Sequence, residues 1–325
     1  MKKMILGALA VAVSISAMGT AHAQAYPSKP VRIMVGYTPG GGVDTTARII
    51  AAELTKVWGT QVLVENRPGA SGNIATELTA KAAPDGHTLV LCNIGSHAIT
   101  PARFRSRLSY DPIGDFAFPA MIGGVPNVLM AHPSLPMKNL REYIAYAKAN
   151  PGKLNFGSSG VGGSPHLSIE LFKTLSGINI VHVPYKGAAA ALADVMSGHM
   201  ESSVGNLAGG PLGAIKAGRV RALGVTSAKR NAQVPEVATF AEQGVKGYDV
   251  TGWYGLCTQS KVAPAILAKI NTDVNTLLRG PLKKRLEDQG ISINATTQEA
   301  FAAHVRAEQD KWTKVVKNAG LEGDK

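Results

Sequence analysis

The chain has 325 residues, of which 45% are hydrophobic and 17% are charged, with 34 Lys and Arg against 22 Asp and Glu. This composition excludes a disordered polyelectrolyte and a bundle of membrane-spanning helices. The two cysteines are too few for a disulfide scaffold or for a structural zinc site made of cysteine alone, and the length suffices for two domains of ordinary size.

The first 23 residues have the three-part pattern of a secretory signal peptide. Lys2 and Lys3 provide positive charge, residues 4–18 form an uncharged apolar run, and Ala21-His22-Ala23 has the small residues that signal peptidase requires. The apolar run is short for a membrane span. We therefore expect cleavage before Gln24 and export to the periplasm or beyond, with an uncleaved anchor as the alternative.

The exported chain remains basic. Removing residues 1–23 lowers the net charge from +12 to +10. A basic chain suits nucleic acid, a membrane surface or acidic small molecules as partners. Export and the lack of a dense Arg and Lys stripe with interleaved aromatic residues count against nucleic acid. We expect the longest basic cluster, Lys283-Lys284-Arg285, to lie on a solvated helix face.

The first half of the exported chain alternates strand-like and helix-like segments. Short apolar runs predict strands, and amphipathic runs between them predict helices. The expected strands are residues 31–35, 62–65 and 88–92, and the expected helices are residues 44–57 and 73–82. This β-α-β-α-β order predicts a parallel sheet with right-handed crossovers.

A second series of the same kind begins near Val128. The expected strands are residues 128–131, 154–156, 180–183, 200–204 and 220–226, and the expected helices are residues 140–149, 165–175, 188–197, 264–278, 282–289 and 298–319. Both halves repeat the order strand, glycine-rich loop, helix. The sequence therefore predicts two α/β domains related by internal similarity.

Two glycine-rich loops, each between a strand and a helix, are suited to binding an anion. Loop one is residues 37–44 (YTPGGGVD), and loop two is residues 157–166 (GSSGVGGSPH). The first turn of a helix has unpaired backbone N–H groups, and glycines let the chain approach a ligand closely. The alternative is that the glycines only make tight turns and that Asp44 or Ser164 caps its helix. Because the loops occupy equivalent places in two domains, we favour a ligand site in the cleft between them.

Short motifs along the exported chain resemble one family. In chain order they are Tyr26 to Pro30, Pro39 to Asp44, Glu65 to Ala70, Pro84 to Leu89, Gly157 to Gly160, His166-Leu167 and His182 to Gly187. Together they resemble the Bug-type solute-binding proteins of tripartite tricarboxylate transporters. The resemblance covers essentially the whole exported chain, and its motifs occur in family order.

The resemblance implies a periplasmic binding protein of type II, in which two α/β domains, each a mainly parallel sheet flanked by helices, enclose a ligand cleft. Residues 24–124 plus 251–325 form domain 1 in this interpretation, and residues 125–250 form domain 2. The implied ligand is a small organic carboxylate held between the two loops, often with bridging waters, and delivered to integral membrane permease subunits. We expect a monomer with no cofactor and no metal.

The candidate ligand-binding residues lie in the two loops and just after neighbouring strands, where open α/β sheets bind ligands. They are Tyr37, Thr38, Pro39, Gly40, Gly41, Gly42, Asp44, Asn93, Ser96, Ser158, Ser159, Gly160, Gly162, Gly163, Ser164, His166, Tyr185, Gly187 and Asn206. Asp44 either caps a helix or orients a ligand group. Trp253 and Tyr254 are either core residues or an aromatic wall of the cleft. We expect Gly41→Val to weaken ligand binding, because a branched side chain would occupy the anion site.

Enzyme functions find little support in the sequence. It has no G-x-S-x-G, H-E-x-x-H or C-x-x-C motif, neither loop ends as a P-loop does, and the eight histidines are scattered without metal-ligand spacing. The alternatives to a transport receptor are a periplasmic hydrolase that uses Ser164 and a binding protein that serves a sensor. The ligand stays open among citrate-like, dicarboxylic, aromatic and amino-acid carboxylates.

The two cysteines, Cys92 and Cys257, both lie in apolar strand-like runs. We expect two buried, unpaired thiols that pack as small apolar groups. A disulfide formed in the oxidising compartment is the alternative.

Overall fold

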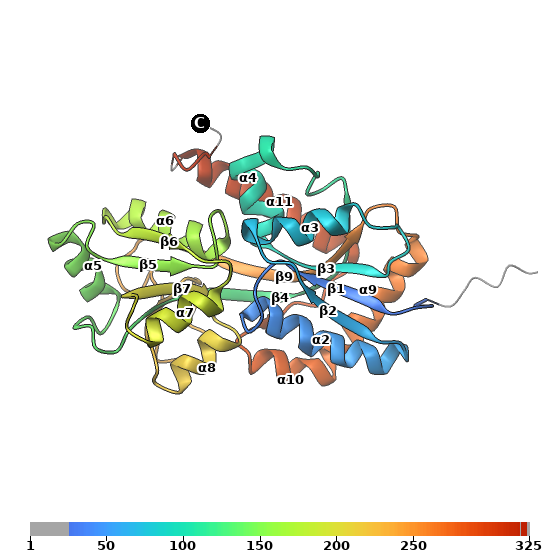
Figure 1. Ribbon diagram of the computed structural model, residues 1–325, viewed down its shortest axis with the longest axis horizontal. Coiled ribbons are helices and arrows are strands. Elements are labelled where there is room, and N and C mark those ends of the chain that lie inside the picture. Colours follow the sequence, from blue (N-terminus) through green and yellow to red (C-terminus); the bar gives the residue numbers. More distant parts are fainter. Residues whose placement is uncertain (1–25, 319, 324–325) are drawn as a thin grey trace, which may run out of the picture.

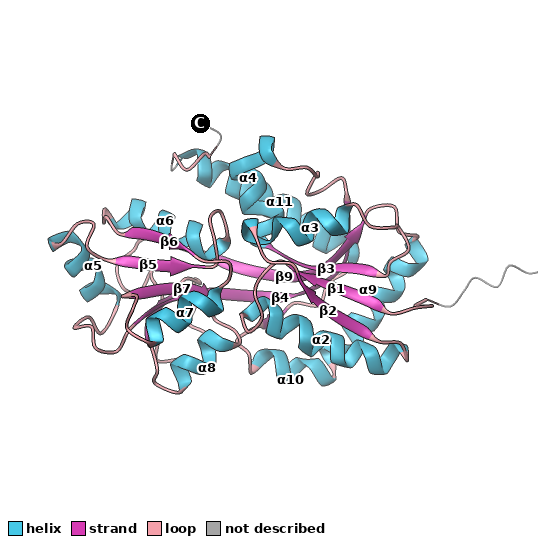
Figure 2. Ribbon diagram, in the orientation of Figure 1, coloured by secondary structure: helices cyan, strands magenta, loops and turns pink. Residues whose placement is uncertain are grey.

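The structure is a computed structural model that describes residues 26–318 and 320–323. The predicted signal peptide, residues 1–23, lies outside these residues. Figures 1 and 2 show two lobes side by side, each a sheet with helices on its faces, joined by long strands. Within the described part of the chain, no helix is both long and apolar enough to cross a bilayer.

The first lobe is built on a parallel sheet of three strands. β1 (Val31–Val35) pairs with β2 (Val62–Asn66) on one side and with β3 (Thr88–Asn93) on the other. α2 (Gly42–Trp58) follows β1 and buries an apolar face, and α3 (Asn73–Ala80) follows β2. The predicted β-α-β-α-β order is confirmed, and the parallel strands all end at the same edge of the sheet.

The second lobe repeats this arrangement. β5 (Asn155–Ser158) pairs in parallel with β6 (Val181–Pro184) and with β7 (Ser202–Asn206). The helices of this lobe are α5 (Leu140–Ala149), α6 (Ser164–Ser176), α7 (Ala188–Met196) and α8 (Gly210–Lys216).

Two long strands connect the lobes and run antiparallel to their neighbours. β4 (Phe116–Ala131) pairs with β9 (Thr251–Gln259) as far as Pro126, and from Asn127 onward it pairs with β7. Since β9 also pairs with β3, the sheet runs continuously in the order β2-β1-β3-β9-β4-β7-β5-β6. Two further strands pair with β4, namely β8 (Arg221–Val225) in the second lobe and β10 (Ser292–Ile293) in the first.

Helices from the C-terminal part of the chain cover the first lobe. α9 (Pro264–Arg279) and α10 (Pro281–Glu287) pack against α2, and α11 (Gln298–Asn318) packs against β4 and α4 (Thr100–Phe104), as Figure 1 shows. Three short helical turns complete the lobe, and they are η1 (Ala70–Gly72), the π-helical turn η2 (Gly95–Ile99) and η3 (Arg105–Arg107).

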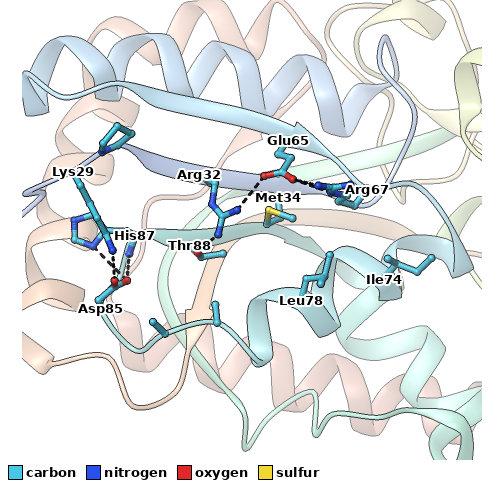
Figure 3. A pocket seen from close by; sticks show the side chains of 13 residues that line it. Lys29, Arg32, Met34, Glu65, Arg67, Ile74, Leu78, Asp85, His87 and Thr88 are labelled. Carbon is cyan, nitrogen blue, oxygen red and sulfur yellow. Dashed lines mark hydrogen bonds and ion pairs between the residues drawn. The ribbon is translucent and has the colours of Figure 1, made fainter.

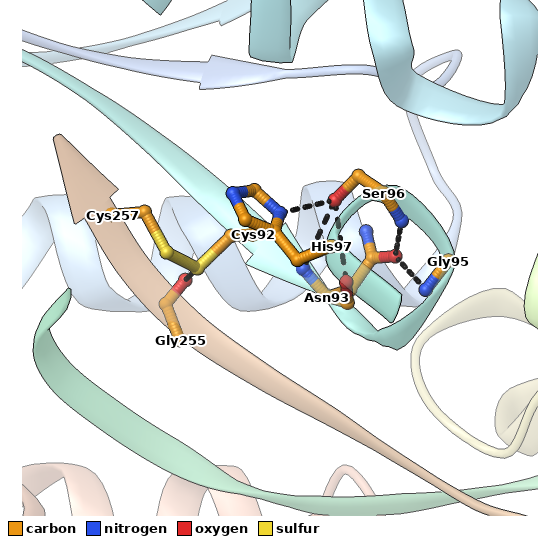
Figure 4. Close-up of a disulfide and its surroundings, with 7 residues drawn as sticks. All are labelled: Cys92, Asn93, Gly95, Ser96, His97, Gly255 and Cys257. Carbon is orange, nitrogen blue, oxygen red and sulfur yellow. Dashed lines mark hydrogen bonds between the residues drawn. A yellow bond between two sulfur atoms is a disulfide. The ribbon is translucent and has the colours of Figure 1, made fainter. Parts of the chain in front are cut away.

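Cys92 and Cys257 form a disulfide between β3 and β9, so the expectation of two unpaired thiols is wrong. The two strands are adjacent and antiparallel, with Cys92 opposite Gly255 and Val90 opposite Cys257. This register places the two Cα atoms 5.8 Å apart, which is within the range that a disulfide spans. Figure 4 shows the bond between the two strands, and both cysteines are buried. The sequence did not reveal that these strands are neighbours, because 165 positions separate the two cysteines.

Candidate functional site

A small cavity lies between the lobes, at the carboxyl ends of β1, β3, β5 and β7. Its volume of about 250 Å³ includes open solvent at its mouth, and its interior has room for about one water molecule. The residues that line it come from both lobes and from β9, and they are Tyr37, Asn93, Ile94, Ser159, Ser164, Pro165, Asn206, Gly252, Trp253 and Tyr254. Ligands of open α/β sheets bind at this edge. The cavity therefore joins the two predicted halves of the site.

Loop one is held in shape by Asp44. The Asp44 carboxylate accepts hydrogen bonds from the Gly40 N–H at 3.0 Å, from Arg48 Nε at 3.0 Å and from Asn66 Nδ2 at 2.9 Å. Burial raises the pKa of Asp44, but these hydrogen bonds outweigh burial and hold the pKa below its ordinary value. Asp44 does not line the cavity, and the N-cap of α2 is Gly41. The structure thus gives Asp44 a third role, that of fixing the backbone of loop one.

Polar side chains of the second lobe form a connected chain that ends at the cavity. Asn206 Nδ2 donates to Asn127 Oδ1 at 2.8 Å, and Asn127 Nδ2 donates to Ser164 Oγ at 3.0 Å. Because Ser164 Oγ already accepts this bond, its hydroxyl hydrogen is available for an acceptor inside the cavity. Ser164 is also the first residue of α6, whose N–H groups lie at the same place.

The first lobe contributes a rigid polar turn. Asn93 Oδ1 accepts hydrogen bonds from the N–H groups of Gly95, at 2.8 Å, and Ser96, at 3.2 Å, as Figure 4 shows. The Tyr37 hydroxyl donates to the Ser71 carbonyl at 2.8 Å, and burial raises the pKa of Tyr37 to about 12. Tyr37 and Asn93 are therefore fixed in place, and both are neutral.

The lobes contact each other around the cavity, and three of these contacts involve loop one or Ser71. A Cβ placed on Gly187 would overlap the Thr38 hydroxyl oxygen and lie 3.1 Å from the Thr38 nitrogen. A Cβ placed on Gly42 would lie 3.0 Å from the Ala208 Cβ. The Ser71 hydroxyl donates to the Val161 carbonyl of loop two. These contacts bring loop one onto the second lobe and enclose the cavity.

Five of the nineteen predicted residues line the cavity, and they are Tyr37, Asn93, Ser159, Ser164 and Asn206. Several of the others hold neighbouring groups in place or lie where the lobes meet. Ser96 bonds to Asn93, Ser158 lies 2.7 Å from His182 Nε2, and Tyr185 donates to Asp194 Oδ2 on α7. The residues outside the lining are Thr38, Pro39, Gly40, Gly41, Gly42, Asp44, Ser96, Ser158, Gly160, Gly162, Gly163, His166, Tyr185 and Gly187.

Gly41 has free space around it, whereas other glycines near the cavity are closely packed. A Cβ on Gly41 would meet only the Thr38 carbonyl oxygen, at 3.9 Å, and its φ of −77° suits any residue. Gly41 is outside the cavity lining, and the expected weakening of ligand binding by Gly41→Val stays a prediction. Gly42 and Gly187 are two of the positions at which a side chain would collide with the opposite lobe.

Five lining residues are not among the nineteen, and they are Ile94, Pro165, Gly252, Trp253 and Tyr254. Of these, Trp253 and Tyr254 were expected as either core or an aromatic wall, and they are both buried and part of the lining. Three of the five are consecutive in β9, which crosses between the lobes directly behind the cavity. The aromatic pair in this strand was visible in the sequence. The position of β9 between β3 and β4 could not be inferred from the sequence.

Two histidines stack beneath loop two. The rings of His166 and His182 lie 3.9 Å apart, and His166 Nδ1 accepts a hydrogen bond from the Gly162 N–H at 3.1 Å. Burial, followed by the neighbouring His182, lowers the pKa of His166 to about 2. Burial also lowers the pKa of His182 to about 4 and that of His97 to about 3. All three rings are neutral at pH 7.

We expect the protein to lose stability steadily as the pH falls below 6.5. In that range the unfolded chain binds protons on these histidines and the folded chain does not. Each histidine therefore lowers the free energy of unfolding by up to about 1.4 kcal/mol for every pH unit. Chemical denaturation between pH 7 and pH 4 measures this slope. His166→Gln should reduce it, and His199→Gln, at an exposed position, should not. An unchanged slope in His166→Gln would contradict the assignment.

A wider groove of about 1370 Å³ runs along the first lobe beside α3, and Figure 3 shows its charged residues. These charged side chains form ion pairs with one another. Lys29 Nζ lies 2.8 Å from Asp85 Oδ2, and Arg67 Nη2 lies 2.5 Å from Glu65 Oε1. All of the residues that line the groove belong to the first lobe, whereas both lobes line the smaller cavity. The smaller cavity is the better candidate site.

Known proteins share this architecture over their whole length. Rpa4515 of R. palustris, solved with adipate, superimposes with a TM-score of 0.87 at 36% identity, over 91% of this chain and 98% of that one. MatC (Rpa3494) of Rhodopseudomonas palustris, solved with bound malate, gives a TM-score of 0.84 at 31% identity, over 90% and 100%. BugT of Bordetella pertussis is 31% identical over 299 residues, which are 92% of this chain and 91% of BugT.

The family model of the tripartite tricarboxylate transporter family receptor matches residues 46–321. The chain belongs to this family. The resemblance seen in the motifs and the predicted α/β fold of a periplasmic binding protein are confirmed. As a tripartite tricarboxylate transporter receptor, the protein binds a solute and is not an enzyme. No group of three or more His, Cys, Asp or Glu side chains placed to hold a metal occurs among the residues that the structure describes.

Proposed function

We propose that this receptor captures a small organic carboxylate in the cavity between its lobes. The observation that supports this most strongly is an enclosed space that receives hydrogen-bond donors from both lobes at the N-terminus of α6. None of the described residues that line it carries a charge, so an anion there depends on backbone N–H groups, hydroxyls and the helix dipole. The adipate and malate bound by the two similar structures belong to the same chemical class.

The proposal includes the partner and the location. Domains of residues 24–124 plus 251–325 and of residues 125–250 close over the acid, and the loaded monomer passes it to membrane permease subunits from the periplasm. The change of β4 pairing at Pro126 and Asn127, opposite Thr251 and Asn206, supports this division. The cleavable signal peptide remains a prediction from residues 1–23.

A hydrolase that uses Ser164 fits the geometry poorly. A serine nucleophile needs a base that takes its proton. Ser164 Oγ instead accepts a hydrogen bond from the Asn127 amide, which cannot take a proton, and His166 Nδ1 is occupied by the Gly162 N–H. This arrangement favours a binding role for the Ser164 hydroxyl.

A thermal-shift screen with succinate, malate, adipate, citrate, benzoate and aspartate tests the function. We expect at least one acid to raise the melting temperature without being converted to product. Ser164→Ala should then lower the affinity for that acid about fivefold, since it removes one donor. Ser197→Ala, an exposed serine in the second lobe, is the control. Turnover that Ser164→Ala abolishes would instead establish the hydrolase.

A further inference from the structure

Tyr254 brings a phenol hydroxyl to the cavity from β9. The residue is 1% exposed and lies in the lining. Its hydroxyl lies 3.1 Å from the point that a Cβ on Gly42, the first residue of α2, would occupy, and the Asn206 Cβ lies 3.4 Å from the same point. The hydroxyl thus lies between the start of α2 and the second lobe.

This hydroxyl is buried and has no hydrogen-bond partner among the described residues. A buried donor without a partner destabilises the state that contains it, and native proteins rarely keep one without a reason. The other phenol of the cavity, Tyr37, donates to the Ser71 carbonyl. Burial raises the pKa of Tyr254 well above its ordinary value, so the group remains a neutral donor.

We propose that the Tyr254 hydroxyl donates a hydrogen bond to an acceptor oxygen of the bound acid, next to the N-terminus of α2. This inference rests on the proposed function and adds a requirement to it. The acid must carry an oxygen that reaches Tyr254 when the lobes are closed, and acids that cannot place one there bind less tightly. Tyr254 is thereby a specificity-determining residue contributed by the strand that connects the lobes.

The test compares Tyr254→Phe with the wild type by calorimetric titration of succinate, malate and adipate. We expect affinity to fall about tenfold for the acids that bind. A loss confined to malate, which differs from succinate by one hydroxyl, identifies that hydroxyl as the acceptor. An equal loss for malate and succinate identifies a carboxylate oxygen. Affinity unchanged for every acid that the wild type binds would overturn this inference and leave the proposed function standing.

The melting temperatures of the ligand-free variants give a second readout. The two variants should affect melting temperature and affinity in opposite ways. Tyr254→Phe removes a hydroxyl without a partner, so its melting temperature should equal or exceed that of the wild type. Tyr143→Phe is the matched control, because Tyr143 is equally buried and its hydroxyl lies 2.9 Å from Ser202 Oγ. It should lower the melting temperature and leave affinity unchanged. A lower melting temperature in Tyr254→Phe would overturn the inference, and a wild type that none of the acids stabilises would overturn the proposed function with it.

Discussion

Gly187→Ala is expected to weaken binding of the acid on the order of a hundredfold while the ligand-free protein stays folded. In the closed arrangement the added Cβ would overlap the hydroxyl oxygen of Thr38 on the opposite lobe. The backbone itself accepts alanine, because the φ of Gly187 is 165° and ψ is 157°, which is extended. The substitution therefore opposes closure and not the fold of the second lobe. Calorimetric titration and a ligand-free melting curve measure the two effects separately.

A second substitution identifies the contact responsible. Thr38→Ala removes a buried hydroxyl without a partner among the described residues, so combining it with Gly187→Ala should restore part of the affinity. The Thr38 Cβ and nitrogen remain 3.1 Å from the added Cβ. Gly213→Ala is the control, since a Cβ there meets no atom within 4 Å. A double variant as weak as Gly187→Ala alone would show that the overlap with the Thr38 hydroxyl is not what weakens binding.

Replacing both Cys92 and Cys257 by alanine is expected to lower the free energy of unfolding by about 2–5 kcal/mol. The bond closes a loop over a sequence separation of 165 residues, which contains the whole second lobe, and restricts the unfolded chain accordingly. Denaturation of the variant and of the wild type, with and without a reductant, measures this loss. Ligand affinity should persist, because the cysteines do not line the cavity.

The reductant provides the control for the disulfide. Reduced wild type should unfold like the double alanine variant, apart from the small packing difference between thiols and methyl groups. Equal stability of the oxidised wild type and the variant would mean that the bond does not restrain the chain.

Local patterns predicted most of the secondary structure. Helix α5 matches its predicted range, residues 140–149, and α6 extends the predicted 165–175 by one residue at each end. These segments have regular apolar spacing and clear end signals, such as the Asn139 cap of α5. Residues 116–127 of β4 were missed, since prolines and glycines interrupt its apolar run.

Contacts between distant segments could not be predicted in this way. The Cys92–Cys257 disulfide and the cavity wall at Tyr254 both depend on the place of β9 between β3 and β4. No local pattern specifies which strands become neighbours across such a separation. Loop one and loop two were found because glycines at helix starts are a local signal, but which of their residues face the cavity depends on how the lobes meet.

A crystal structure of the protein with the acid that stabilises it most would test the central claim directly. We expect the acid in the cavity between the lobes, with a carboxylate near Ser164 and the N-terminus of α6. Density for the acid in the open groove beside α3, or in any place that only one lobe contacts, would contradict this account.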